Sequence, residues 1–205
     1  MNKKQNLTLE KAFLLALQNR QDNFEVAENL FKETLQNEPN HFQANFFLGV
    51  LSAITKKFDI AKHLLNKATE IDPYNFDAHT NLGNVLKELG EYKKAIVCYE
   101  KIIQIQPNNN VSAYNNLAFI LKDLGEYKKA IALYEKAIQI DPSNISIING
   151  LSDLFKIIQL DNVTKTNSAS LKELFLFLFR KNNVNHADIF PVAKLLLFVG
   201  ENDNQ

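Results

Sequence analysis

The sequence has few of the residues that mark secreted, nucleic-acid-binding or membrane-spanning proteins. Cys98 is the single cysteine among 205 residues, so no internal disulfide can form, and this favours a reducing compartment such as the cytoplasm. Arg20 and Arg180 are the only arginines, whereas surfaces that read phosphates or RNA favour the planar guanidinium fork. No apolar run approaches the ~20 residues that a membrane-spanning helix needs.

Net charge is also lacking, because 23 basic residues balance 23 acidic ones. No global field therefore draws the chain to nucleic acid or to an acidic membrane. The opening stretch MNKKQNLTLEKAFLLAL has a basic start, but Glu10 and Lys11 interrupt its apolar run, so we expect no signal peptide. These features predict a cytoplasmic protein with neither nucleic acid nor membrane as a partner.

Catalytic and metal-binding patterns are missing as well. The histidines His41, His63, His79 and His186 are scattered without metal-ligand spacing, and Cys98 has no histidine near it in sequence. Burial as a structural cysteine is the expected role of Cys98. The glycines form no phosphate-binding loop. We therefore expect no catalytic residue, no metal and no cofactor.

What the sequence does contain is an internal repeat. Asn81–Pro107 and Asn116–Pro142 are identical at about two thirds of their paired positions, and LGEYKKAI occurs in both, at Leu89–Ile96 and Leu124–Ile131. Self-similarity at this period is typical of a stacked, quasi-one-dimensional fold in which each repeat contacts its neighbours.

Four prolines mark the period of the repeat. They stand at Pro39, Pro73, Pro107 and Pro142, at steps of 34, 34 and 35 residues, with the extra residue in Asn108–Asn110. Each follows the end of a helical pattern, because the residue before proline is disfavoured in the helical region. The spacing thus predicts one repeat between successive prolines.

Each period has room for two helices. In the third they are expected at Phe76–Leu89 and Tyr92–Ile105, with Gly90 closing the first, and Gly125 has the same place in the fourth. Glycine suits this position because the chain leaves the helix through a positive φ.

Small residues recur where the two helices should cross. Gly49 and Gly83 lie inside the first helices, where glycine costs ~1 kcal/mol relative to alanine, so a packing reason is expected. Ala118 takes that place in the fourth repeat. Small side chains facing large ones let antiparallel helices interdigitate. The other small positions are Ala27, Ala61, Ala95 and Ala130, and the large ones are Leu48, Leu82, Leu117, Phe31, Leu65, Tyr99 and Tyr134.

This pattern resembles the tetratricopeptide repeat. It has the leucine–glycine pair, the alanine, the aromatic four residues after it and the closing proline. The resemblance implies an all-α fold, a right-handed α-solenoid of antiparallel helix pairs. It covers about residues 8–160 of a solenoid domain expected at residues 1–160, with repeats at about 8–41, 42–75, 76–110 and 111–144 and a lone helix at 145–160. The first repeat is degenerate, because Leu14-Leu15 stands where leucine–glycine is expected.

The period is lost in residues 161–205. After the polar stretch DNVTKTNSAS, the segment SLKELFLFLFRK is apolar almost all round, which predicts a buried helix. In ADIFPVAKLLLFVG, Asp188 is expected to cap a last helix with Pro191 in its first turn. These helices are expected to cap the open end of the stack, and docking of a partner or further domain is the alternative.

The family resemblance implies that the first helix of each pair lines a concave groove, as in modules that bind a protein or an extended peptide. Asn81 and Asn116 occupy matching places and predict a short asparagine ladder, since an amide both donates to and accepts from a peptide backbone. The cationic clamp of chaperone adaptors does not fit these positions. The candidate binding residues are Phe46, Phe47, Val50, Asp77, Thr80, Asn81, Asn84, Lys87, Asn115, Asn116, Phe119 and Lys122, with Ser112 on the same face.

A second functional class stays open. Such repeats resemble the N-terminal part of bacterial proteins related to O-linked N-acetylglucosamine transferases, and comparable repeats precede sulfotransferase or methyltransferase domains. The chain would then be a substrate-recruiting arm whose catalytic domain lies elsewhere. We favour a non-catalytic interaction module, and transferase turnover by the isolated chain would contradict it.

Overall fold

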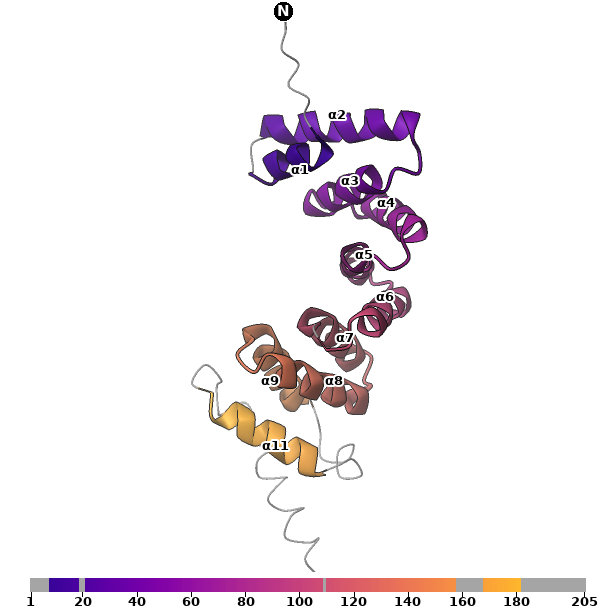
Figure 1. Ribbon diagram of the computed structural model, residues 1–205. Coiled ribbons are helices and arrows are strands. Elements are labelled where there is room, and N and C mark those ends of the chain that lie inside the picture. Colours follow the sequence, from indigo (N-terminus) through magenta and orange to yellow (C-terminus); the bar gives the residue numbers. More distant parts are fainter. Residues whose placement is uncertain (1–7, 19–20, 109, 158–167, 182–205) are drawn as a thin grey trace, which may run out of the picture. The chain divides into compact units, whose positions relative to one another are not determined.

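The computed structural model describes residues 8–18, 21–108, 110–157 and 168–181, and all regular secondary structure within these ranges is helical. The chain divides into two compact units, residues 1–105 and 106–205. Figure 1 labels the helices of both units. The all-α class and the paired helices predicted from the sequence are confirmed. The expected boundary between residues 160 and 161 lies outside the described residues, as do Asp188 and Pro191.

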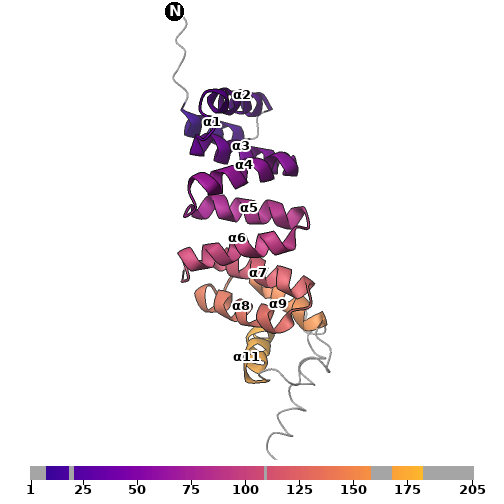
Figure 2. The same ribbon diagram turned by 90° about the vertical axis from the view of Figure 1, so that its right-hand side faces the viewer.

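The first unit consists of three helix pairs, which lie one after another in chain order (Figure 2). Each helix packs against the next, and the first helices also contact one another, α1 with α3 and α3 with α5. The outward sides of these first helices therefore belong to one face. The helices are α1 (Leu9–Leu17), α2 (Gln21–Asn37), α3 (Phe42–Ile54), α4 (Phe58–Ile71), α5 (Phe76–Glu88) and α6 (Tyr92–Ile105).

The second unit begins with one further helix pair. α7 packs against α8 and also contacts α9, so α7 and α9 repeat the relation between first helices seen in the first unit. The expected lone helix begins at Ile145, as predicted, and its described part ends at Ile157. The helices are α7 (Val111–Asp123), α8 (Tyr127–Ile140), α9 (Ile145–Ile157) and α11 (Ser168–Phe179).

Thr8 Oγ1 caps α1 by accepting from the Lys11 N–H at 3.3 Å, and side chains cap α3, α5 and α7 in the same way. His41 Nδ1 and the Oδ1 atoms of Asn75 and Asn110 each accept a hydrogen bond from the backbone N–H three residues on, at 3.4, 3.0 and 3.3 Å. A cap of this kind satisfies one of the amide groups that the first helical turn leaves without a partner. The residues shortly after each proline therefore decide where the next repeat begins.

The turns inside three helix pairs share one backbone geometry. Gly90 and Gly125 have φ values of 71° and 76°, which confirms the predicted closing glycines, and Lys56 holds the matching place with φ 59°. In each turn this residue donates its N–H to the carbonyl three residues back, and the next residue donates five residues back, to Ser52 for the turn at Lys56. This is the Schellman arrangement, in which a left-handed residue ends a helix. A left-handed conformation at Lys56 could not be predicted from its residue type, because lysine rarely adopts a positive φ.

Close helix crossing explains the glycines inside first helices, as predicted. A Cβ atom added to Gly49 would lie 2.8 Å from Leu65 Cγ, and one added to Gly83 would lie 3.0 Å from the Tyr99 ring. Both large side chains are fully buried, and so is Ala118 in the fourth repeat. Small residues on the first helices thus leave room for large residues on the second.

The carbonyl oxygen of each repeat-closing proline is held by a polar side chain. In three repeats the donor comes from the first helix that follows, six or seven residues after the proline, and in the last it is Lys181, just after α11. The pairs are Asn45 with Pro39 (3.1 Å), His79 with Pro73 (3.0 Å), Tyr114 with Pro107 (2.8 Å) and Lys181 with Pro142 (2.9 Å).

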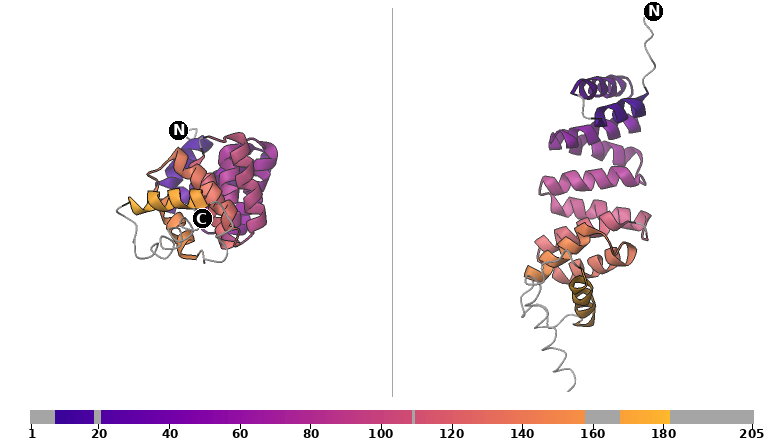
Figure 3. Two further views of the ribbon diagram at one scale, coloured as in Figure 1. Left: turned by 90° about the horizontal axis from the view of Figure 1, so that it is seen from below. Right: turned by 90° about the vertical axis from the view of Figure 1, so that its left-hand side faces the viewer.

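Lys181 belongs to the apolar segment predicted to cap the stack. α11 lies across the end of the α8–α9 part of the second unit (Figure 3). Its Phe175 ring meets the buried Phe155 of α9 edge-on, 6.4 Å between centroids, and Leu178 is fully buried. Burial on every side, however, was wrong, because Phe179 is 51% exposed. Of its described side chains, Leu174 and Leu178 are buried and the three between them are partly buried, so its apolar character exceeds what its packing requires.

Candidate functional site

The predicted apolar part of the site is an aromatic group on α1 and α3. The Phe47 ring stacks on Phe13 at 4.5 Å between centroids and lies 5.9 Å from the buried Phe31, so Phe47 packs against the hydrophobic core. Phe46 stacks on Phe42 at 5.8 Å and is partly exposed. Both rings of this predicted pair are partly exposed, and their centroids lie 5.6 Å apart.

Polar side chains on α5 form the next part. Asn81 is partly exposed, and its Nδ2 donates to the carbonyl of Asp77 at 2.8 Å. Asn84 Oδ1 accepts a hydrogen bond from the Tyr99 hydroxyl at 2.8 Å, which ties α5 to α6. Thr80 Oγ1 donates back to its own helix. These contacts hold the polar side chains on the helix surface, and they give Asn84 a structural role as well.

Val50 of α3 and Lys87 in the last turn of α5 are both partly exposed. Val50 is therefore accessible in the same unit as Phe46. Lys87 adds a positive charge near the C-terminal end of its helix, where a cation is favoured by the helix dipole.

On α7 the predicted residues fall into two kinds. Asn115 and Asn116 are partly exposed near the start of the helix, and Phe119 is 38% exposed one turn later. Lys122 is only 7% exposed, with its ammonium 4.5 Å from the centre of the Phe119 ring and 3.7 Å from Asp123 Oδ1. A ligand thus meets the amides and the Phe119 ring more readily than the charge of Lys122.

Asn81 and Asn116 belong to different units, so the ladder between them stays a prediction. Within the second unit, α7 forms one wall of a hollow of about 200 Å³. The opposite wall is made by Asn144 and Ser146, at the start of α9. Sequence reasoning missed these two residues, because they follow Pro142 in a repeat that has no recognisable second helix.

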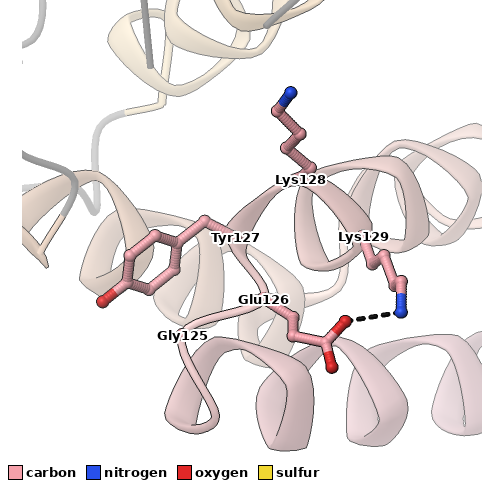
Figure 4. Close-up of a pocket in the computed structure, with 5 residues that line it drawn as sticks. All are labelled: Gly125, Glu126, Tyr127, Lys128 and Lys129. Carbon is pink, nitrogen blue, oxygen red and sulfur yellow. Dashed lines mark ion pairs between the residues drawn. The ribbon is translucent and has the colours of Figure 1, made fainter. Parts of the chain in front are cut away.

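A larger hollow, of about 430 Å³, lies at the turn between α7 and α8 and is bordered by residues 125–129. Its side chains diverge: Tyr127 and Lys128 point in different directions, and Glu126 pairs with Lys129 at 2.5 Å (Figure 4). A binding site usually has a few polar groups that converge on a ligand. The smaller hollow beside Asn115 meets that description better.

Three buried side chains that can titrate, Cys98, Tyr99 and Tyr134, belong to the hydrophobic core. Burial raises the pKa of Cys98 to about 11, so this thiol stays protonated and unreactive at neutral pH, as its expected structural role requires. Burial also raises the pKa of Tyr99 and of Tyr134. Unlike the Tyr99 hydroxyl, the buried Tyr134 hydroxyl has no hydrogen-bond partner.

Ion pairs connect successive helix pairs in the first unit. Glu28 of α2 pairs with Lys57 at 3.5 Å, and Lys62 of α4 pairs with Glu91 at 2.9 Å. Lys62 lies 34 residues after Glu28, and Glu91 lies 34 residues after Lys57, so the acidic and basic positions are exchanged between the two pairs. Hydrogen bonds from Lys94 and Lys62 lower the pKa of Glu91.

Within the described residues, no group of three or more His, Cys, Asp or Glu residues could hold a metal ion. Across the same ranges, none of the helices has both the length and the apolar character to cross a bilayer.

Comparison with known proteins places these elements in a family. Two family models, both described as tetratricopeptide repeat, match residues 12–59 and 74–143, together more than half of the chain. The search of curated proteins found no match.

Solved structures share the fold. "YrrB: a TPR protein with an unusual peptide-binding site" is 19% identical with a TM-score of 0.68, covering 94% of this chain and 90% of that one. Two crystal structures of MamA have TM-scores of 0.64. One is 21% identical and covers 89% of this chain and 92% of its own, and the other is 23% identical and covers 72% and 81%. At these identities the likeness establishes the fold.

Proposed function

The chain belongs to the tetratricopeptide repeat family, and from that premise we propose that it binds an extended peptide segment of a partner protein along its first helices. The coarser role, a protein–protein interaction module, is the one that the repeats and the similar structures support. The peptide mode is supported by the printed description of YrrB, a similar fold with a peptide-binding site.

The observation that carries the proposal is the chemistry of the first helices. Their inner sides pack against the second helices, whereas their outward sides carry partly exposed amides: Asn81 on α5 and the Asn115–Asn116 pair on α7. An amide can donate to and accept from a peptide backbone whatever its sequence. In the first unit, Phe46 supplies an apolar surface for one side chain of the peptide.

A peptide library displayed on phage tests this proposal. Peptides enriched on the full chain would be measured by fluorescence anisotropy against the wild type and against variants Asn81→Ala, Asn116→Ala and Phe46→Ala. Each lost hydrogen bond or apolar contact should weaken binding by about fivefold to tenfold. Asn66→Ala is the matched control, because Asn66 is an exposed asparagine on the second helix α4.

The control variant should bind as the wild type does. If the enriched peptides bind all three first-helix variants with unchanged affinity, the peptide does not lie on this face and the proposal fails. A peptide whose binding falls with Asn66→Ala instead would place recognition on the second helices.

A further inference from the structure

One side of α1 is exposed although the matching side of α3 is buried. Leu14 is 61% exposed and Leu17 is 41% exposed. Their counterparts Leu48 and Leu51 lie 34 residues later in α3 and are only 6% and 3% exposed. The neighbouring positions on this side are likewise exposed in α1 and buried in α3. We call this side of α1 the end face. Its residues are Glu10, Lys11, Leu14, Leu17 and Gln18.

The preceding repeat covers the matching side of α3. Leu48 and Leu51 belong to a hydrophobic cluster that includes Ala27 and Phe31 of α2. The same kind of contact recurs one repeat later, where α4 packs against α5. No helix precedes α1 in the described part of the chain. The end face therefore continues the interface between repeats, and its form suits the second helix of a helix pair.

The position of Lys11 shows which part of such a helix fits. Its counterparts in α3, α5 and α7 are Asn45, His79 and Tyr114. Each of these side chains holds the carbonyl oxygen of the proline that closes the preceding second helix, at 2.8–3.1 Å. Lys11 is exposed, and its ammonium can donate hydrogen bonds. A helix that lies on the end face as α4 lies on α5 would bring its last carbonyl groups to Lys11.

The charges of the end face suit the same end of a helix. The C-terminus of a helix carries a partial negative charge, which the ammonium of Lys11 complements. Basic residues are common in the last turn of a helix, and the exposed carboxylate of Glu10 can pair with one of them. Leu14 and Leu17 form an apolar centre between these charged residues and Gln18. An apolar centre with a polar rim is the usual composition of a protein interface.

A second copy of this chain does not offer a helix end of this kind among its described residues. The carbonyl groups of the four prolines that close its second helices already accept hydrogen bonds. Their donors are Asn45, His79, Tyr114 and Lys181. A different protein is therefore the source of the helix that fits the end face.

We propose that the end face of α1 binds the C-terminal end of an amphipathic helix of a partner protein. Apolar side chains of that helix pack on Leu14 and Leu17, and Lys11 donates to its last carbonyl groups. Glu10 pairs with a basic residue of its last turn. The end face shares no residue with the set proposed to bind a peptide, so it is a second interaction surface and goes beyond the proposed function.

A stapled peptide of residues 58–74 is a suitable probe, because α4 packs against the first helix that follows it in this protein. A hydrocarbon staple between positions 59 and 63, which are both exposed in α4, would keep the peptide helical. Two-dimensional NMR of the full chain would follow the leucine methyl signals during titration with this peptide. We expect saturable shifts of the Leu14 and Leu17 signals and no shifts with a stapled peptide of scrambled sequence.

Variants identify the groups that bind the peptide. Leu14→Gln should weaken binding by about tenfold, because it removes an apolar contact. Leu124→Gln is the matched control, since Leu124 is an exposed leucine at the end of α7, and it should bind as the wild type does. Lys11→Met keeps the length of the side chain and removes the donor, so binding should weaken by about threefold to tenfold. Leu14 and Lys11 are exposed, so both variants should fold.

The proposal is overturned if the peptide leaves the Leu14 and Leu17 signals unchanged, or if Leu14→Gln and Leu124→Gln bind it equally well. Sedimentation equilibrium of the full chain tests the other occupant. Self-association that is lost in Leu14→Gln would assign the end face to a second copy and would also overturn the proposal. Peptides selected by phage display should bind Leu14→Gln as they bind the wild type, so this proposal and the proposed function can fail separately.

Discussion

The turn residue Lys56 offers the sharpest test of the structural reasoning. It has a φ of 59°, although its counterparts in the next two helix pairs are Gly90 and Gly125. A left-handed conformation costs a residue with a side chain roughly 1–2 kcal/mol, which glycine avoids. Glycine also makes the unfolded chain more flexible, which opposes the gain by ~0.4–1 kcal/mol. We therefore expect Lys56→Gly to stabilise the protein by about 0.5–1 kcal/mol.

The reverse change should have the opposite sign. A Cβ added to Gly90 would meet no atom within 4 Å, so Gly90→Ala creates no clash and changes only the two backbone terms. The same two terms predict a loss of about 0.5–1 kcal/mol. Urea unfolding followed by circular dichroism would measure both changes, and a gain of 1 kcal/mol should raise Tm by about 2–4 °C in a chain of this length.

Lys56→Ala serves as the control, because alanine removes the long side chain and keeps the strained φ, so stability should change little. Backbone strain at Lys56 is ruled out as the source of the cost if Lys56→Gly destabilises the protein, or if Lys56→Ala stabilises it as much as glycine does. In the latter case the side chain, and not the backbone conformation, would be the source of the cost.

Three further outcomes follow from single contacts. Tyr99→Phe should lower the free energy of unfolding in urea by about 1 kcal/mol, because it removes a hydroxyl that donates to α5. Tyr134→Phe should be neutral or stabilising, because the buried Tyr134 hydroxyl has no hydrogen-bond partner. Equal losses in the two variants would contradict this prediction. Because the folded-state pKa of Glu91 is lowered, its contribution to stability is present above the unfolded value of about 4.3 and is lost as pH falls through the lower folded pKa. When the free energy of unfolding is measured as a function of pH, Glu91→Gln should lose less stability on acidification than the wild type does. If the two proteins lose stability equally, Glu91 does not contribute to this pH dependence. Lys181→Met should speed amide hydrogen exchange in α11 while that of α7 is unchanged, and unaltered exchange in α11 would show that the bond to the proline carbonyl does not hold the helix.

Much of the fold could be predicted from the sequence because a repeat protein uses local rules several times. The proline period, the closing glycines and the small residues at helix crossings each depend on neighbouring residues or on one helix partner. Gly83 illustrates this, since its neighbour across the crossing, Tyr99, lies in the same repeat. The face expected to bind a peptide came from the family resemblance, and it stays a prediction.

Tertiary structure decided the features that depend on longer contacts. Phe46 and Phe47 are neighbours of the same residue type, yet Phe47 stacks on Phe13 of the preceding repeat, whereas Phe46 stacks on Phe42 of its own helix. The hollow beside Asn115 exists only because the start of α9 faces α7, and the bond from Lys181 to Pro142 spans 39 residues. Local propensity determined where helices begin and end, because capping and left-handed turns act within a few residues. Only the tertiary structure decided which side chains are buried and which polar groups find hydrogen-bond partners, because both depend on which distant groups come together.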